Sequence, residues 1–222
     1  MRVMSILAHP DDEAFSCGGT LVKHAKNGDE TFIVTLTMDD VRKEEFVQAG
    51  KILGAEPISL DYSLITPNNQ REIREKLIRI IRAKKPDTVI THVEYDYHLE
   101  HRLCRDIVLD AIEWASHFTY DKETESHQVK TIYAVETTVL IPYPEFLVDI
   151  SDVLETKRKA CEVYKSQTRK LNSSFYSDFH ITRTKLRGIQ ARTVHAEAFE
   201  QVKQVFTGSF KKLGSVDTLP SL

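Results

Sequence analysis

Short apolar segments alternate along this chain with longer amphipathic ones, and this alternation limits the possible folds more than any other feature of the sequence. Strands that alternate with helices form βαβ units, in which the sheet is mainly parallel and helices cover both faces. We therefore predict an α/β, Rossmann-like doubly wound fold. Apolar or β-branched runs predict strands, and periodic segments between them predict helices: strands at 3–8, 31–38, 57–62, 87–92 and 131–136, and helices at 16–27, 42–54, 69–86, 100–116 and 152–165.

The length of the chain, 222 residues, is typical of one domain. No internal repeat, low-complexity tract or linker divides it. We expect a single domain over residues 1–222. The part that follows residue 165 is mixed in pattern, and the sequence predicts no clear element there.

Composition excludes several classes of partner. The formal net charge is -3 and the pI is about 6.3, so no strongly basic surface indicates nucleic acid binding. No apolar run approaches the roughly 20 residues that span a membrane, and the first residues do not predict a secretory signal. The cysteines, Cys17, Cys104 and Cys161, lie far apart and favour neither a disulfide framework nor a cysteine zinc site. We expect a cytoplasmic protein.

Two dense polar motifs follow predicted strands. The letters HPDDE come directly after the first strand, and HVEYDYHLEH begins at the end of the fourth. In a doubly wound sheet of order 3-2-1-4-5, strands 1 and 4 are neighbours, and ligands bind in the crevice outside their carboxyl ends. If the chain has this order, the two motifs meet in one crevice.

The residue types in these motifs indicate a metal site. His9, Asp12 and His101 provide two imidazoles and one carboxylate, a set that suits Zn²⁺ with an open fourth position and equally an Fe²⁺ facial triad. A bound cation would also explain why three successive acids are tolerated. Asp11 would then be free to take a proton from water. His98 would stabilise an oxyanion or protonate a leaving amine.

Several motifs together resemble the PIG-L/LmbE-like metal-dependent N-acetylglucosamine deacetylases. AHPDDE matches the family signature letter for letter, and HLEH stands where the family usually has His-Pro-Asp-His. VDIS before a helix and the closing RGIQARTVHAEAF also resemble the family pattern. The resemblance implies that His9, Asp12 and His101 bind a metal, usually zinc, that Asp11 is the general base, and that His98 acts on the tetrahedral intermediate.

The resemblance also implies contacts with substrate. Arg42 would hydrogen-bond sugar hydroxyls, and Asp96 and Tyr97 stand where some members contact substrate. Leu99 and Glu100 replace the usual Pro-Asp, which keeps the spacing of the metal ligands and changes the loop. A homo-oligomer is expected from the resemblance alone.

Two other histidines are not predicted to act directly. His92, at the end of the fourth predicted strand, is expected to be buried or to support the site rather than to bind metal. His180 is expected to lie on the surface.

The sequence therefore predicts hydrolysis of an N-acetyl amide by water activated at a metal. The substrate would be a small-molecule GlcNAc-type amino sugar or its conjugate. Two alternatives stay open. Magnesium-dependent phosphoryl transfer, or a receiver-like protein, also uses paired acids after strand 1, but its ligands are oxygens and it needs no histidines. A non-catalytic metal- or ligand-binding protein would not need Asp11 as a second, unligated carboxylate.

Overall fold

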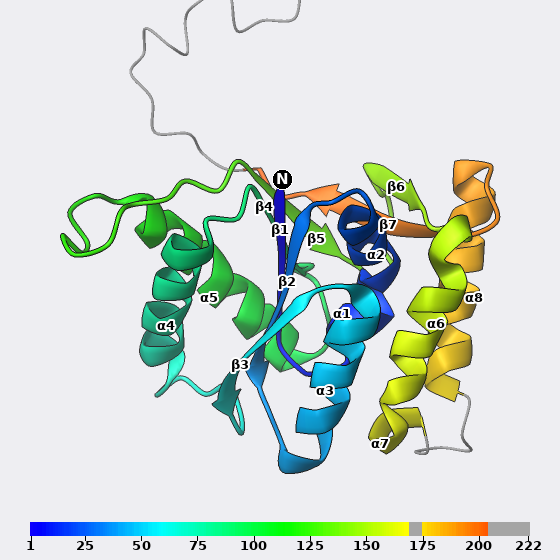
Figure 1. Ribbon diagram of the computed structural model, residues 1–222, viewed down its shortest axis with the longest axis horizontal. Helices are drawn as coiled ribbons and strands as arrows, with labels where there is room; N and C mark the ends of the chain where they lie inside the picture. Colours follow the sequence, from blue (N-terminus) through cyan, green and yellow to red (C-terminus); the bar gives the residue numbers. More distant parts are fainter. Residues whose placement is uncertain (169–174, 204–222) are drawn as a thin grey trace, which may run out of the picture.

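Residues 1–168 and 175–203 are the part of the chain that the computed structural model describes, and within them seven strands form one sheet (Figure 1). The strand order is β3-β2-β1-β4-β5-β7-β6. The strands are β1 (Arg2–Leu7), β2 (Glu30–Thr37), β3 (Glu56–Tyr62), β4 (Thr88–His92), β5 (Thr131–Val135), β6 (Phe146–Asp149) and β7 (Ala196–Gln201). The helices are α1 (Asp12–Ser16), α2 (Gly18–Lys26), α3 (Asp40–Leu53), α4 (Gln70–Lys84), α5 (Leu99–Ser116), α6 (Leu154–Val163), α7 (Lys165–Thr168) and α8 (Phe175–Ala191), with a 3-10 turn η1 at Ser151–Val153.

The first five strands confirm the predicted α/β, doubly wound arrangement. β1 pairs in parallel with β2 and β4, β2 with β3, and β4 with β5, so the order 3-2-1-4-5 is correct. β7 extends the sheet by pairing antiparallel with β5 and β6, an extension that the sequence did not predict. β6 has only four residues, and β7, with the sequence AEAFEQ, has no β-branched residue, so neither has a strong strand pattern.

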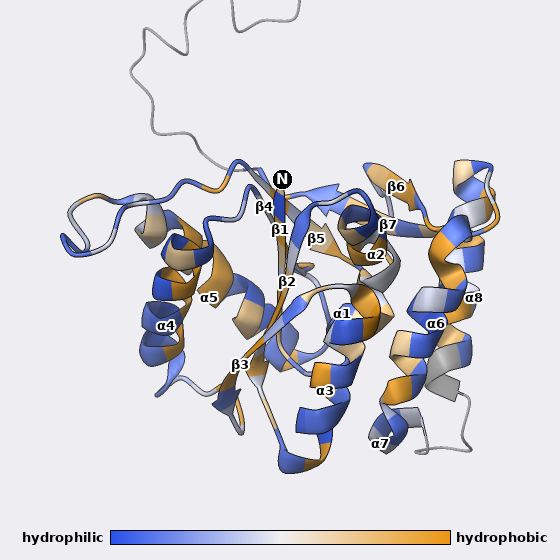
Figure 2. Ribbon diagram, viewed as in Figure 1, coloured by the Kyte–Doolittle hydropathy of each residue, from blue (hydrophilic) through white to orange (hydrophobic). Residues whose placement is uncertain are grey.

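Helices cover both faces of the sheet. α4 and α5 lie on one face, whereas α1, α2, α3 and α6 lie on the other, with α8 beside β6 and β7 (Figure 1). Successive side chains of β1 point to opposite faces of the sheet. Val3 and Leu7 belong to the hydrophobic core on one face, and Met4 and Ile6 belong to the core on the other. Both sets of side chains are buried. Figure 2 shows hydrophobic colouring along the central strands of the sheet. Each such side chain contributes roughly 1.5–3 kcal/mol through burial.

The predicted helix at 16–27 differs from the observed structure. Helix begins at Asp12 and is divided at Cys17 into α1 and α2, so Ser16 is the last residue of α1 and does not cap a helix. The break is stabilised by a distant residue, because the backbone N–H groups of Gly19 and Thr20 donate to the carboxylate of Glu197. A contact across the whole chain cannot be read from the local sequence.

Other helix ends follow local signals. α3 ends at Gly54, whose φ of 72° is left-handed, as a glycine C-cap allows. The predicted helix at 152–165 is divided into η1, α6 and α7, since the backbone of Tyr164 leaves the helical region between α6 and α7. In the part of the chain that the structure describes, no helix is both long and apolar enough to cross a membrane.

The sheet order brings the two polar motifs together. Val3 of β1 lies beside Thr88 of β4, and Ser5 lies beside Ile90. The loops that follow both strands therefore leave the sheet at the same edge. This edge is the crevice predicted from the sequence.

Candidate active site

The loop after β1 has a strained backbone that turns its acidic side chains toward the crevice. Asp11 has a φ of 117°, a conformation that favours glycine. Its N–H donates to Glu13 Oε2 at 3.1 Å, and its carbonyl accepts from the N–H of Phe15 at 3.0 Å. Such strain is found mainly at functional sites, where the surrounding contacts maintain it. The strained turn brings the Asp11 and Asp12 side chains to the wall of one cavity.

Three atoms of the kind that bind metals, two imidazole nitrogens and one carboxylate oxygen, converge beside this turn. His9 Nδ1 lies 3.4 Å from Asp12 Oδ2, His101 Nε2 lies 3.6 Å from the same oxygen, and the two ring nitrogens are 3.2 Å apart. A tetrahedral ion with bonds of about 2.0–2.1 Å separates its ligands by about 3.3–3.4 Å. His9, Asp12 and His101 therefore form a possible metal-binding triad.

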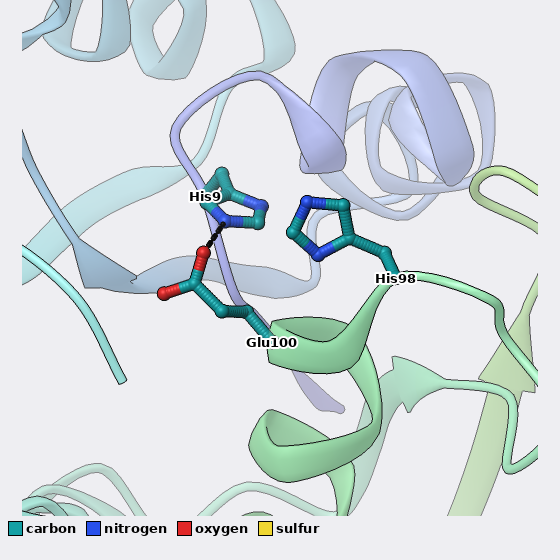
Figure 3. A group of neighbouring side chains, drawn as sticks. All are labelled: His9, His98 and Glu100. Atoms are coloured by element: carbon teal, nitrogen blue, oxygen red, sulfur yellow. Dashed lines mark hydrogen bonds and ion pairs between the residues drawn. The ribbon is translucent and has the colours of Figure 1, made fainter. Parts of the chain in front are cut away.

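Two carboxylates orient the rings of the triad. His9 Nε2 is hydrogen-bonded to Glu100 Oε2 at 2.9 Å, as Figure 3 shows, and Glu100 Oε1 accepts from the N–H of Ile65. His101 Nδ1 is hydrogen-bonded to Asp96 Oδ2 at 3.0 Å. Each imidazole therefore turns its other nitrogen toward the convergence point. This carboxylate–histidine arrangement is typical of metal ligands.

Among the residues that the structure describes, two other groups of side chains lie close enough to hold an ion: His9, His98 and Glu100, and His92, Asp96 and His101. In the first group, Glu100 already accepts a hydrogen bond within the group. In the second, His92 Nε2 accepts from the N–H of Ala8 at 2.9 Å, and its Nδ1 bonds to Thr137 Oγ1. Both nitrogens of His92 are thus engaged, and the fully buried ring stacks on His101. This geometry agrees with the expectation that His92 supports the site.

The electrostatic field at the triad favours positive charge. Burial lowers the pKa of His9, but hydrogen bonds with Asp12 and Glu100 outweigh it and raise that pKa to about 10. Burial raises the pKa of Asp12, but the nearby His101 and the hydrogen bond with His9 hold it well below its ordinary value. A field that stabilises imidazolium here would also stabilise a divalent cation.

Asp11 is a carboxylate with raised basicity. Burial and the neighbouring Asp12 carboxylate raise the pKa of Asp11 well above its ordinary value, whereas Arg42 opposes this rise. Arg42 Nη1 lies 3.5 Å from Asp11 Oδ2. Asp39, the N-cap of α3, holds this arginine by accepting from its backbone N–H and its Nε. A buried carboxylate of this kind is suited to accept a proton.

His98, the N-cap of α5, presents its ring to His9 (Figure 3), and the ring centroids lie 5.0 Å apart. Burial, His101 and His9 lower the pKa of His98. The neutral imidazole is therefore favoured, and a neutral imidazole can still donate one hydrogen bond from a ring nitrogen.

A cavity of about 300 Å³ brings together seven of the eight site residues predicted from the sequence: His9, Asp11, Asp12, Arg42, Tyr97, His98 and His101. Tyr97 is 72% exposed and lies at the rim. Asp96 is the exception, because it is only 1% exposed and its oxygens bond to His101, Thr138 and the N–H of His98. The expectation that Asp96 contacts substrate is therefore corrected: it holds His101 and the start of α5.

Sequence reasoning missed several residues of the cavity. Thr137 and Gln167 line it, as does His180 of α8, which is 4% exposed and not a surface residue as expected. One signal was present in the sequence. His180, Arg183, Thr184 and Arg187 have the spacing of a single helix face, and all four are buried. A polar stripe of that kind indicates a face turned toward a polar interior.

The chain is similar in sequence to known deacetylases. The model of the PIG-L family, described as GlcNAc-PI de-N-acetylase, matches residues 4–112. A diacetylchitobiose deacetylase from Thermococcus kodakarensis is 26% identical, over 75% of this chain and 70% of that protein. The resemblance inferred from AHPDDE is thereby confirmed.

Two solved structures share the fold. An N,N'-diacetylchitobiose deacetylase from Pyrococcus horikoshii aligns with a TM-score of 0.79 and 24% identity, over 90% of this chain and 83% of that one. A 4-carboxy-2-hydroxymuconate hydratase from Pseudomonas putida aligns with a TM-score of 0.77 and 21% identity, over 94% and 98%. Because the second is a hydratase, the fold alone does not define the reaction.

Proposed function

We propose that this chain, whose residues 4–112 match the PIG-L family model, is a metal-dependent hydrolase that removes the acetyl group from an N-acetyl amino sugar or its conjugate. The proposal is supported by the name of the matching family model, a de-N-acetylase, and by the name of the relative from Thermococcus kodakarensis, a diacetylchitobiose deacetylase. The observation that carries it is the convergence of His9 Nδ1, Asp12 Oδ2 and His101 Nε2 beside a carboxylate outside the triad, Asp11.

We assign the metal to His9, Asp12 and His101. Zinc or ferrous iron bound there would lower the pKa of water and polarise a carbonyl oxygen. The chain contributes the orientation of the ligands, because Glu100 and Asp96 fix which nitrogen of each imidazole faces the site.

Asp11 is assigned as the general base. Its raised pKa makes it a better proton acceptor than an ordinary aspartate, and the positive charge of Arg42 opposes the rise and so favours the ionised form. Asp11 takes the proton of the attacking water and can later return it to the departing amine.

His98 is assigned the role of stabilising the oxyanion that develops on the acetyl carbonyl. Its lowered pKa favours the neutral ring, so its contribution is a hydrogen bond donated from nitrogen rather than a full positive charge. Arg42 and Tyr97 lie on the cavity wall and are assigned to the sugar.

The two alternatives fit the site less well. Magnesium prefers oxygen ligands in octahedral geometry, whereas this triad offers two imidazoles and one carboxylate. A protein that only binds metal would gain nothing from an unligated carboxylate with a raised pKa, held in a strained backbone.

Acetate release tests the proposal. We expect protein reconstituted with zinc or ferrous iron to bind about one ion per chain and to release acetate from N-acetylglucosamine or N,N'-diacetylchitobiose. Chelation should abolish turnover, and the same ion should restore it, while magnesium should not. Folded, zinc- or iron-loaded protein that releases no acetate from a panel of N-acetyl sugars would contradict the proposal, and binding of those sugars without acetate release would favour the non-catalytic alternative.

The pH profile tests the pairing of Arg42 with Asp11. Because the positive charge of Arg42 lowers the pKa of Asp11, Arg42→Met should raise that pKa further. A general base must be ionised, so the acidic limb of log kcat/KM against pH should move to higher pH. Arg42→Lys, which keeps the charge, is the matched control and should move the limb less. An acidic limb that stays in place in Arg42→Met would remove Asp11 from the role of base.

A further inference from the structure

His180 enters the candidate site from an element remote in the sequence. It belongs to α8, lines the same cavity as His98 and Asp11, and is 4% exposed. None of the roles proposed above uses it.

The position of the His180 ring is fixed relative to the general base. The ring stacks on Phe15, with centroids 4.4 Å apart and planes 12° apart, and Phe179 packs against it edge-on. Phe15 lies one helical turn beyond Asp11, whose carbonyl accepts its N–H. The imidazole is therefore a rigid part of the wall, because aromatic stacking and the helix both restrain it.

The ring is also chemically unsatisfied. His180 Nδ1 is buried and has no hydrogen-bond partner in the part of the chain that the structure describes. Burial, Arg183 and Lys157 lower the pKa of His180 well below its ordinary value, so the ring is neutral. A neutral imidazole has one donor and one acceptor, and a buried polar group left unpaired costs about 1–3 kcal/mol. Buried polar groups without partners are uncommon in folded proteins.

The two threonine hydroxyls of the cavity wall are already engaged within the protein. The Thr137 hydroxyl accepts from Ser16 and bonds to His92, and the Thr138 hydroxyl donates to Asp96. Among the described residues, His98 Nδ1 also lacks a partner, but His98 is assigned to the oxyanion. His180 is therefore a lining group whose hydrogen-bonding capacity no proposed role uses.

We propose that His180 is a specificity-determining residue whose ring edge hydrogen-bonds a hydroxyl of the amino sugar. The inference rests on the proposed function, in which the triad, Asp11 and His98 are committed to the amide and the water. The polar groups of the substrate that remain are its hydroxyls. A hydroxyl both donates and accepts, so it suits either tautomer of the ring. A half-turn of the ring about χ2 keeps its plane, and therefore its stack on Phe15, while it changes which nitrogen meets the cavity.

The test combines the removal of the His180 hydrogen bond with the removal of single hydroxyls from the substrate, as in a double-mutant cycle. We compare kcat/KM of wild type and His180→Phe on N-acetylglucosamine and on its monodeoxy analogues. Phe keeps the stack on Phe15 and removes the hydrogen bond. We expect a loss of roughly 5- to 100-fold on the parent sugar. For the one analogue that lacks the contacted hydroxyl, the two proteins should be nearly equal.

The controls separate recognition from folding. Melting temperature and bound metal are measured for each variant. His180→Gln, which restores a polar edge, should recover part of the loss, and His117→Gln, which changes an exposed histidine at the end of α5, should behave as wild type. If His180→Phe does not fold, His180→Gln is compared with wild type in the same cycle. An equal loss on every analogue, or no loss on any, would overturn the assignment.

Failure of this inference is distinguishable from failure of the proposed function. Wild-type protein that releases no acetate contradicts the proposed function, whereas active wild type with an unselective His180→Phe contradicts only the role of His180. Calorimetric binding of the same sugars to both proteins gives a second readout that does not depend on turnover.

Discussion

Asp11→Asn should keep its metal and lose turnover by roughly 10²–10⁴-fold, the usual contribution of general acid–base catalysis. Asparagine matches aspartate in size and keeps one acceptor oxygen, but its amide does not accept a proton from water. Asp11 lies outside the triad, since the converging atoms belong to His9, Asp12 and His101. The substitution should therefore leave the ligands in place while it removes the base.

Asp12→Ala is the variant with which Asp11→Asn should be compared, because it removes a proposed metal ligand instead of the proposed base. The two acids are adjacent and chemically identical, yet Asp12 Oδ2 lies within 3.6 Å of both triad nitrogens. Its removal should weaken metal binding itself, and added zinc should restore part of the activity. Added zinc should not rescue Asp11→Asn. Turnover and bound metal are measured side by side, and a loss of metal in Asp11→Asn with retention in Asp12→Ala would reverse the two roles.

The position of the site could be predicted from the sequence because two local patterns determine it. Hydrophobic alternation predicts the strands, and parallel strands bring their carboxyl ends to one edge. The polar residues after β1 and β4 then had to meet if the sheet had the predicted order, as it does. His98 and His101 keep the spacing of the family motif although Leu99 and Glu100 replace the usual Pro-Asp. The two histidines lie at the start of one helix, α5, which fixes their separation.

The parts that the sequence did not predict depend on contacts between distant residues. Glu100 was recognised only as a departure from the family pattern, and its bond with His9 becomes visible once α5 is placed against the loop after β1. Asp96 was assigned to substrate because nothing local shows that its oxygens are consumed by His101 and Thr138. The sequence does not place His180 in the site, because the spacing of its buried polar neighbours becomes a helix face only once residues 175–191 are known to form α8.

Glu197 is a structural residue for which we expect one of the largest losses of stability. Glu197 Oε1 lies 2.6 Å from Lys157 Nζ, with side chains 1% and 0% exposed. Its carboxylate also accepts from the N–H groups of Gly19 and Thr20 at the break between α1 and α2, and Lys157 donates to the carbonyl of Phe15. This network holds the end of α1 and the start of α2 in place, directly after the segment that carries Asp11 and Asp12. Glu197→Ala would leave the buried Lys157 ammonium group without its counter-ion, and the N–H groups of Gly19 and Thr20 without an acceptor.

Glu197→Ala should therefore lower the free energy of unfolding by about 3–5 kcal/mol, the usual cost of breaking a buried ion pair from one side. Denaturant unfolding, followed by circular dichroism, measures it. Lys157→Met should cost less, because Glu197 keeps its bonds to the α2 backbone and to the Thr20 hydroxyl. Lys157→Met with Glu197→Gln removes both charges and retains an oxygen for the backbone donors, so the double variant should be more stable than Glu197→Ala. A change in Glu197→Ala no larger than the roughly 0.5 kcal/mol of an ordinary surface substitution would show that the helix break does not depend on this pair.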